Sequence, residues 1–147
     1  MASRPLTVAI VGATGAVGVE FLRCLAQRCF PVKELRLLAS ARSAGRELSF
    51  DGKALVVQEL TEKSFDGVDI ALFSAGGSIS KRYAPVAVAA GAIVVDNSSA
   101  FRMAPQVPLV IPEINASAIA GPTGIVANPN CAAIIEITPL WPIHRHN

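Results

Sequence analysis

A glycine-rich turn between an apolar strand and an amphipathic helix constrains the fold of this chain most strongly. Residues 6–11 form a β-branched apolar run, which predicts a buried strand. Glycines recur at 12, 15 and 18 directly after it, and Val17, Phe21 and Leu25 then repeat at helical spacing. Small residues in such a turn let the backbone approach a pyrophosphate, which sits on the N-terminus of the helix. The pattern favours a dinucleotide-binding unit over a simple tight turn.

The composition narrows the class of protein. The chain has 147 residues, of which 52% are hydrophobic and 16% are charged, so a globular domain with a sizeable core is expected. The net charge is only +2 and no basic run occurs, which argues against nucleic acid or a membrane surface as a partner. No apolar run has the length of a transmembrane span, and three cysteines give no disulfide framework. A cytoplasmic location is predicted, and no metal site is predicted.

Further apolar runs alternate with helical patterns along the rest of the chain. Helices are predicted at residues 79–90, at 116–120 and from 132 onward, and residues 112–115 are predicted to form a turn. Strands are predicted at residues 35–39, 54–60, 69–73, 92–96, 107–111 and 124–127. This alternation predicts an α/β fold with a doubly wound, mostly parallel sheet of the Rossmann-like type.

The loop after the second strand bears on which dinucleotide would bind. An NAD-preferring domain usually carries an acidic residue there, which holds the ribose 2′-hydroxyl. Residues 40–45 contain no acid, but they place Arg42 between Ser40 and Ser43. A cation flanked by hydroxyls suits a 2′-phosphate, so NADP is the predicted cofactor. The alternative is a solvated surface arginine.

Three more loops follow strands in the second half of the chain, at residues 74–78, 96–102 and 128–131. A doubly wound topology gathers such loops on one edge of the sheet, where ligands bind. Arg102 would therefore lie near Cys131 and offer a fork of donors to a phosphate or carboxylate. The alternative for Arg102 is a surface ion pair, for example with Glu113.

Cys131 stands where a short strand gives way to a helix. Asn-Pro-Asn at residues 128–130 stops the strand, and Asn130 is suited to cap the helix that follows. The free N–H groups and positive dipole end of a helix N-terminus favour a thiolate. Cys131 is the candidate nucleophile, against the alternative of a small buried core cysteine.

Together these motifs resemble aspartate-semialdehyde dehydrogenase. The resemblance rests on residues 12–18, 40–45, 96–103, 110–115 and 127–131, and it runs in order from about Thr7 to the end of the chain. It implies NADPH-dependent reduction of β-aspartyl phosphate to aspartate β-semialdehyde and phosphate, on the route to lysine, threonine and methionine.

The resemblance also implies roles for individual residues. Cys131 would be the nucleophile that forms a thioester, Asn130 would help to fix it or the substrate, and Arg102 would bind the phosphate group. The family usually has a hydroxyl residue after the cysteine, where this chain has Ala132. The predicted cofactor-binding residues are Gly12, Thr14, Gly15, Ala16, Val17, Gly18, Ser40, Arg42, Ser43, Ser74, Ala75, Gly76 and Asn97.

The resemblance divides the chain in two. Residues 1–130 would be the dinucleotide-binding domain, and residues 131–147 would begin the helix that leads into a second, α+β domain. The chain is expected to be truncated before that domain, which holds the acid/base histidine, so the isolated fragment is expected to be inactive. The full-length protein would be a homodimer or homotetramer.

Two other functions remain open from the sequence. N-acetyl-γ-glutamyl-phosphate reductase uses the same chemistry on a longer acid, although the Asn-Pro-Asn-Cys and Ser-Ala-Phe-Arg runs favour the aspartate enzyme. A non-catalytic NADP-binding fragment or pseudoenzyme is the alternative outside enzymes.

Overall fold

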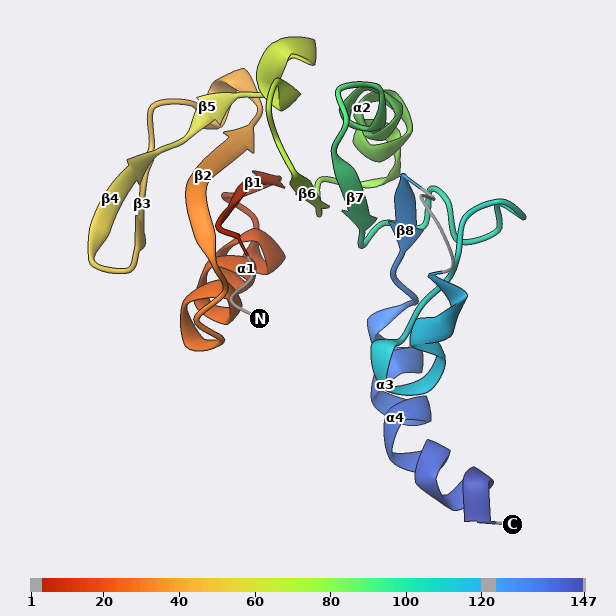
Figure 1. Cartoon of the computed structure of the whole chain (residues 1–147). Helices are drawn as coiled ribbons and strands as arrows, with labels where there is room; N and C mark the ends of the chain where they lie inside the picture. The colour runs from red at the N-terminus through yellow and green to blue at the C-terminus, as the bar shows by residue number, and fades with distance from the viewer. Residues whose placement is uncertain (1–3, 120–123, 147) are drawn as a thin grey trace.

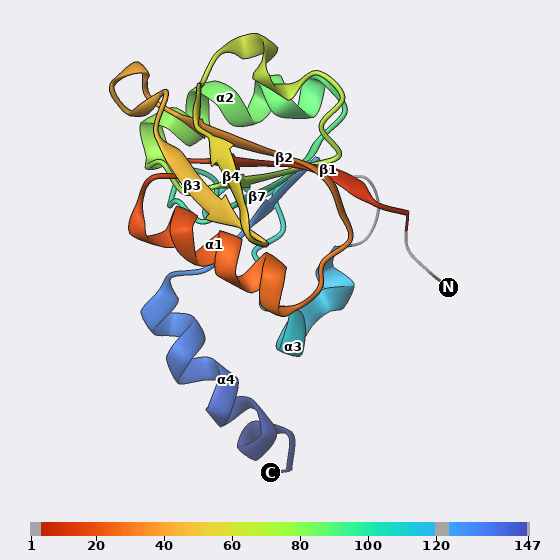
Figure 2. The same ribbon diagram turned by 90° about the vertical axis from the view of Figure 1, so that its left-hand side faces the viewer.

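A six-stranded parallel sheet forms the centre of the chain in a computed structural model that describes residues 4–119 and 124–146. The strand order is β5-β2-β1-β6-β7-β8, so the predicted doubly wound α/β fold is confirmed. The strands are β1 (Leu6–Val11), β2 (Val32–Ala39), β5 (Gln58–Glu59), β6 (Ile70–Phe73), β7 (Ile93–Asp96) and β8 (Ile125–Ala127). Helix α1 (Ala16–Gln27) covers one face of this sheet and α2 (Gly77–Ala89) covers the other (Figures 1 and 2).

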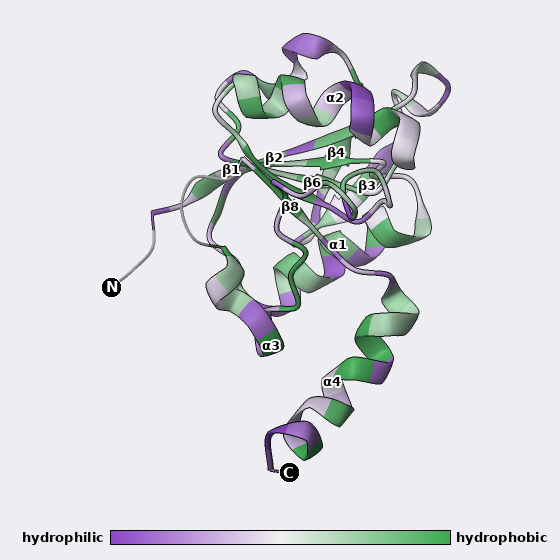
Figure 3. Ribbon diagram, turned by 90° about the vertical axis from the view of Figure 1, so that its right-hand side faces the viewer, coloured by the Kyte–Doolittle hydropathy of each residue, from purple (hydrophilic) through white to green (hydrophobic). Residues whose placement is uncertain are grey.

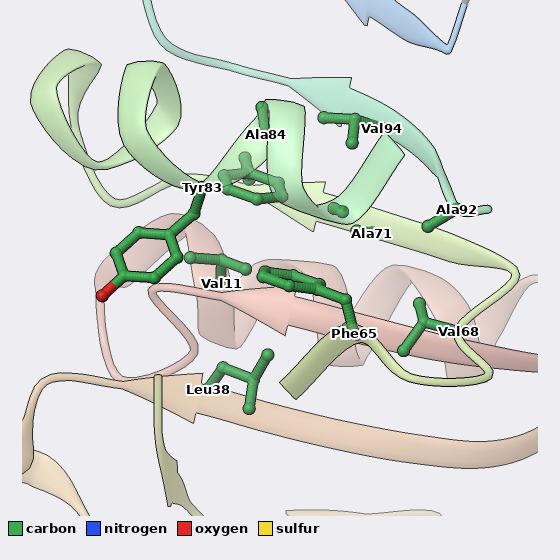
Figure 4. Packing of buried hydrophobic residues seen from close by; sticks show 12 residues of the cluster. Val11, Leu38, Phe65, Val68, Ala71, Tyr83, Ala84, Ala92 and Val94 are labelled. Carbon is green, nitrogen blue, oxygen red and sulfur yellow. The ribbon is translucent and has the colours of Figure 1, made fainter. Parts of the chain in front are cut away.

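Each face of the sheet has its own hydrophobic cluster, because successive side chains of a strand point to opposite faces. Ile10 and Leu37 pack with Leu22 of α1. Val11 and Leu38, the next residues along the same strands, pack on the α2 side with Phe65 and Tyr83 among others (Figure 4). This alternation fixes the register of the strands against both helices.

The strand, glycine turn and helix predicted at the start of the chain are confirmed as β1, residues 12–15 and α1. The second strand begins at Val32, three residues before its predicted start at Leu35. The predicted strands at 69–73, 92–96 and 124–127 are found as β6, β7 and β8, each one residue shorter at its start.

One predicted strand, residues 54–60, is wrong as a single element. It divides into β4 (Lys53–Val56) and β5, and β4 pairs in an antiparallel hairpin with β3 (Glu47–Phe50), which the prediction lacks. Asp51 (φ 48°) and Gly52 (φ 75°) form the two-residue turn. Positive φ at both positions is the geometry of the tight hairpin turn that joins β3 to β4. The predicted strand breaks at Val57, whose N–H donates to the Arg46 carbonyl oxygen and whose carbonyl oxygen accepts from the Gly45 N–H, and β5 then pairs with β2.

The predicted strand at residues 107–111 is also wrong. Leu109 makes an isolated bridge to Ala127, flanked by the bonds Val110 N–H to Ala127 O and Ala127 N–H to Pro108 O. Proline has no N–H to donate, so the segment lies along the edge of β8 without extending the ladder.

The next segment is more helical than predicted. The predicted turn at 112–115 is a short helix, α3 (Pro112–Asn115), which continues into a 3₁₀ turn, Ala116–Ala118. Ala120, the last residue of the helix predicted at 116–120, lies outside the described residues.

Helix α4 (Cys131–His146) leads away from the end of β8 and projects beyond the sheet and its two covering helices (Figures 1 and 2). Many of its residues are hydrophobic (Figure 3), and Ile135, Leu140 and Ile143 are 73%, 57% and 60% exposed. Within residues 4–119 and 124–146, no helix combines the length and hydropathy that crossing a membrane requires.

Candidate functional site

The strand order reverses between β1 and β6, and the carboxyl ends of these two strands meet there. Gly12 follows β1 with φ +87°, and a Cβ on Gly12 would lie 2.4 Å from the carbonyl oxygen of Ser74, which follows β6. A Cβ on Gly18 would lie 2.3 Å from the carbonyl oxygen of Gly12. Both positions therefore require glycine, and the turn packs tightly against α1 and the β6 loop. Ligands of doubly wound sheets bind in the crevice at such a reversal.

A cavity of about 560 Å³ opens at this reversal, within the size range of ligand pockets. Eight of the thirteen predicted cofactor-binding residues line it, although they come from three separate loops. These eight are Gly12, Thr14, Gly15, Ser40, Arg42, Ser43, Ser74 and Ala75.

The other five predicted cofactor-binding residues do not line the cavity. Gly18 is buried under the turn, whereas Ala16 and Val17 are exposed at the start of α1. Gly76 is the residue before α2, with φ 91°. The side chain of Asn97 is engaged elsewhere, as described below.

Arg42 stands on a short 3₁₀ turn, Ala41–Ser43, that closes one wall of the cavity. The Ser43 N–H donates to the Ser40 carbonyl oxygen at 2.8 Å, and Ser43 is buried whereas Ser40 and Arg42 are exposed. Across the described ranges, no carboxylate forms an ion pair with Arg42. The guanidinium is therefore available to an anionic ligand at the cavity.

Eight further lining residues were not predicted, and three of them, Val11, Ala39 and Ala41, lie in or beside the glycine turn and the Arg42 turn. Ile79, Arg82 and Tyr83 stand at positions i, i+3 and i+4 of α2, which places them on one helical face. Glu59 and Leu60 come from the end of β5. The helical spacing after the loop at 74–78 is the sequence signal that identifies the three residues of α2.

A second cluster joins the loops after β7 and β8. Arg102 Nε donates to the Asn128 carbonyl oxygen at 2.9 Å, and Arg102 Nη2 donates to the Asn97 carbonyl oxygen at 2.8 Å. The Asn128 side-chain amide donates to Asn97 Oδ1. The ion pair with Glu113 that served as the alternative for Arg102 does not form within the described part of the chain.

Asp96 anchors the loop that carries Arg102. Its side chain is 0% exposed at the end of β7. It accepts hydrogen bonds from Ser80 Oγ at 2.7 Å, Ser98 Oγ at 2.7 Å and the Ser98 N–H at 3.0 Å. These bonds compensate for burying the carboxylate and fix the loop to α2.

Cys131 is the first residue of α4 and is exposed, so the alternative of a buried core cysteine is wrong. Asn130 Oδ1 accepts a hydrogen bond from the Ala132 N–H at 2.9 Å, which confirms the predicted helix cap. The thiol thus stands at a capped helix N-terminus, next to the segment that Arg102 holds. No group of potential metal ligands is found among the residues that the structure describes.

The fold and the cavity define a Rossmann-like domain of the dinucleotide-binding class. Residues 7–121 match the family model of the semialdehyde dehydrogenase NAD-binding domain, and the chain belongs to this family. The resemblance noted in the sequence is thereby confirmed.

Individual relatives point to one enzyme. The chain is 55% identical over 141 residues to aspartate-semialdehyde dehydrogenase of Synechocystis sp.. This matched region covers 96% of the chain and 42% of the relative. It superposes on aspartate-semialdehyde dehydrogenase II of Vibrio cholerae, solved in complex with ASA, with a TM-score of 0.92 and 49% identity. That match covers 97% of this chain and 47% of the other.

A more distant solved structure was determined with NADP. Aspartate semialdehyde dehydrogenase of Candida albicans matches with a TM-score of 0.78 and 25% identity, over 97% of this chain and 47% of the other. The chain therefore spans less than half the length of each of these relatives.

Proposed function

We propose that this chain is the cofactor-binding and nucleophile-bearing part of an NADP-dependent aspartate-semialdehyde dehydrogenase. The enzyme would reduce β-aspartyl phosphate to aspartate β-semialdehyde and phosphate. The observation that carries this proposal is the meeting of the glycine turn and the Arg42 loop at one cavity, in a chain whose relatives bear this name.

The cavity fits the cofactor. The glycine turn brings backbone N–H groups and the N-terminus of α1 to the place of a pyrophosphate. The turn can lie this close to the β6 loop because Gly12 has no Cβ to collide with the Ser74 carbonyl oxygen. Arg42, with Ser40 and Ser43, would hold the 2′-phosphate. The relative solved with NADP supports this choice of dinucleotide. When bound, NADPH supplies the hydride.

The exposed thiol of Cys131 would carry the covalent chemistry. Its thiolate attacks the acyl carbon of β-aspartyl phosphate, so a C–S bond forms, the C–O bond to phosphate breaks, and inorganic phosphate leaves. Free N–H groups at the start of α4 would stabilise the developing oxyanion. Arg102 uses two of its five donors on backbone carbonyls and keeps the others for the phosphate group.

Asn130 contributes through the helix that carries the nucleophile. Its side-chain oxygen is engaged with the Ala132 N–H, so the amide group remains to contact the substrate. The cap keeps the first turn of α4 ordered and thereby holds the thiol in place. This arrangement supports either role that the family resemblance implies for Asn130, fixing the nucleophile or fixing the substrate.

The same proposal extends to the organisation of the full-length protein. Residues 1–130 form the dinucleotide-binding domain, and α4 leads into a second, α+β domain. This second domain packs on Ile135, Leu140 and Ile143, and the exposure of these three apolar side chains supports such a contact. The full-length enzyme assembles as a homodimer or homotetramer in the cytoplasm. N-acetyl-γ-glutamyl-phosphate reductase is not favoured, because the relatives described above are aspartate-semialdehyde dehydrogenases.

The test is an assay of the full-length gene product with NADP, phosphate and either aspartate semialdehyde or N-acetylglutamate semialdehyde. We expect phosphate-dependent NADPH formation with the aspartate compound, and none from Cys131→Ser, which still binds NADP. Preference for the acetylated compound would support the alternative enzyme. NADP binding without turnover of either compound would support a non-catalytic protein.

A further inference from the structure

We propose that Arg82, held against the ring of Tyr83, forms the platform on which the adenine of the dinucleotide stacks. This inference rests on the proposed function, because it takes NADP as the ligand of the cavity. It assigns to Arg82 a role in affinity for the adenine end that is independent of the 2′-phosphate.

The walls of the cavity leave one place for the adenine. The glycine turn accounts for the pyrophosphate, and the Arg42 turn accounts for the 2′-phosphate. The cavity wall contributed by α2 and residues 59–60 remains, and it consists of Glu59, Leu60, Ile79, Arg82 and Tyr83. Three of these side chains present carbon surface, which suits a flat, uncharged base.

The ring of Tyr83 gives Arg82 a rigid support. Tyr83 is 8% exposed and belongs to the core cluster with Val11, Leu38 and Phe65 (Figure 4). The Cζ of Arg82 lies 4.8 Å from the centroid of this ring. A guanidinium over an aromatic face is stabilised by the cation–π interaction, so the orientation of Arg82 is partly fixed before a ligand arrives.

Arg82 lines the cavity and keeps its donors free for a ligand. Arg82 is exposed, and in the described ranges its side chain forms no hydrogen bond and no ion pair. Planar guanidinium groups stack on aromatic rings and on nucleobases. Tyr83, Arg82 and adenine would then form three stacked layers.

Nearby charges favour adenine over a phosphate as the group on Arg82. Arg82 also borders an adjoining hollow of about 520 Å³, whose lining includes Glu59, Glu62 and Lys63. Apart from Arg82, its two carboxylates exceed its one cation, and this excess of negative charge opposes a phosphate dianion, whereas a neutral base meets no repulsion. Arg42 and Arg82 therefore have different tasks at the same cavity.

The test is isothermal titration of Met1–Asn147 with NADP, NAD and nicotinamide mononucleotide, the last of which lacks adenine. For Arg82→Ala we expect NADP and NAD to bind about fivefold to tenfold more weakly, with their ratio unchanged and the mononucleotide unaffected. Arg82→Lys loses most of the same affinity, because an ammonium has no plane to stack. Lys81→Ala, at the adjacent exposed cation outside the cavity lining, is the matched control and should match wild type.

Two results would contradict the role proposed for Arg82 without contradicting the binding of NADP to the cavity. A loss for NADP alone, with strong salt dependence, would make Arg82 a phosphate ligand. Unchanged binding of NADP and NAD in Arg82→Ala would remove any role for it. If the wild-type chain binds neither dinucleotide, the proposed function fails and the platform fails with it.

Discussion

The side chain of Arg102 ties two loops together through the carbonyl oxygen of Asn128, which Nε reaches at 2.9 Å. A second bond, from Nη2 to the Asn97 carbonyl oxygen, completes the link between the ends of β7 and β8. Cys131 follows Asn128 by three residues. Arg102 thus holds the segment that carries the thiol, in addition to the phosphate contact proposed for it.

Replacing Arg102 with lysine should weaken its tether to the segment that carries Cys131 while keeping the positive charge for the proposed phosphate contact. Lysine keeps the charge but lacks the fork that serves two carbonyls at once, so the segment at 128–131 should exchange its amide hydrogens faster. In the full-length enzyme we expect kcat/KM to fall about tenfold or more, since bonds from a charged donor contribute about 1.5–3 kcal/mol each. Arg28→Lys, at an exposed arginine beyond α1, is the control. Unchanged exchange at 128–131 would show that the tether is dispensable.

Arg42 should decide between the two dinucleotides. Loss of a charge-assisted bond costs about 1.5–3 kcal/mol, so Arg42→Ala should weaken NADP binding about tenfold or more and leave NAD nearly unchanged. Titration calorimetry measures both. Arg46→Ala, at an exposed arginine just beyond the cavity lining, should change neither. Equal losses for the two dinucleotides would argue against a 2′-phosphate contact.

Gly18→Ala should destabilise the fold, because the added Cβ would lie 2.3 Å from the backbone oxygen of Gly12. Overpacking of this kind costs about 1–3 kcal/mol, and neither backbone can move freely. Gly77→Ala is the matched control: its Cβ would meet only Ser99 Oγ, at 4.0 Å, in the first turn of α2. Thermal unfolding should show a lower Tm for Gly18→Ala and an equal or higher one for Gly77→Ala. A Gly18→Ala protein as stable as wild type would contradict the tight turn.

Asp69 should contribute to stability in a pH-dependent manner. The Thr7 N–H donates to its carboxylate at 2.8 Å, and this bond, together with Arg4, lowers the pKa of Asp69 below its ordinary value. A lowered pKa in the folded state stabilises the protein above the unfolded value of about 3.9, and this contribution is lost as pH falls through the folded pKa.

Asp69→Asn should therefore lose stability at neutral pH and show a weaker decline on acidification below about pH 4. Asp66→Asn is the control, because within the described residues only the backbone oxygen of Asp66 accepts a hydrogen bond. Chemical denaturation at a series of pH values measures the effect. Parallel curves for wild type and Asp69→Asn would contradict it.

Cys131 should react faster than the other exposed thiol. Cys131 and Cys29 are both exposed, but of the two only Cys131 stands at the N-terminus of a sixteen-residue helix, a setting in which reactive cysteines are found. Alkylation at neutral pH, followed by peptide mass spectrometry, should label Cys131 well before Cys29, and before the half-buried Cys24. Similar rates at Cys131 and Cys29 would remove the argument for an activated nucleophile.

The elements that the sequence predicts best are those in which one pattern serves both local and tertiary structure. The change from a buried apolar strand to apolar residues at helical spacing, at residues 12–18, identifies β1, the turn and α1. The apolar residues of the strand and those of the helix pack into the same core, so one pattern reports both elements. The prediction lacks the β3–β4 hairpin because each of its strands has only four residues and none of these residues is buried. The Asp51-Gly52 pair is the signal that would have revealed it.

Some residues of the candidate site can be predicted from the sequence and others cannot. Gly12, Arg42 and Ser74 follow the ends of three strands, and parallel strands bring such residues to one edge, so their meeting at a cavity is predictable. The partners of Arg102 are not predictable, because they are backbone carbonyls on two loops whose spacing depends on the whole sheet. Arg82 was missed because it lies six residues beyond the end of its loop at Gly76, inside a helix.

The most direct test of the central claim is hydrogen–deuterium exchange of Met1–Asn147 with and without NADP. The cavity at the β1–β6 reversal predicts slower exchange in the glycine turn at 12–18, the Arg42 turn at 40–45 and the first turns of α2. It predicts no change at the hairpin of β3 and β4, which lies outside the lining apart from its flanking loops. Protection confined to that hairpin, or to no segment at saturating NADP, would contradict the assignment of this cavity as the cofactor site.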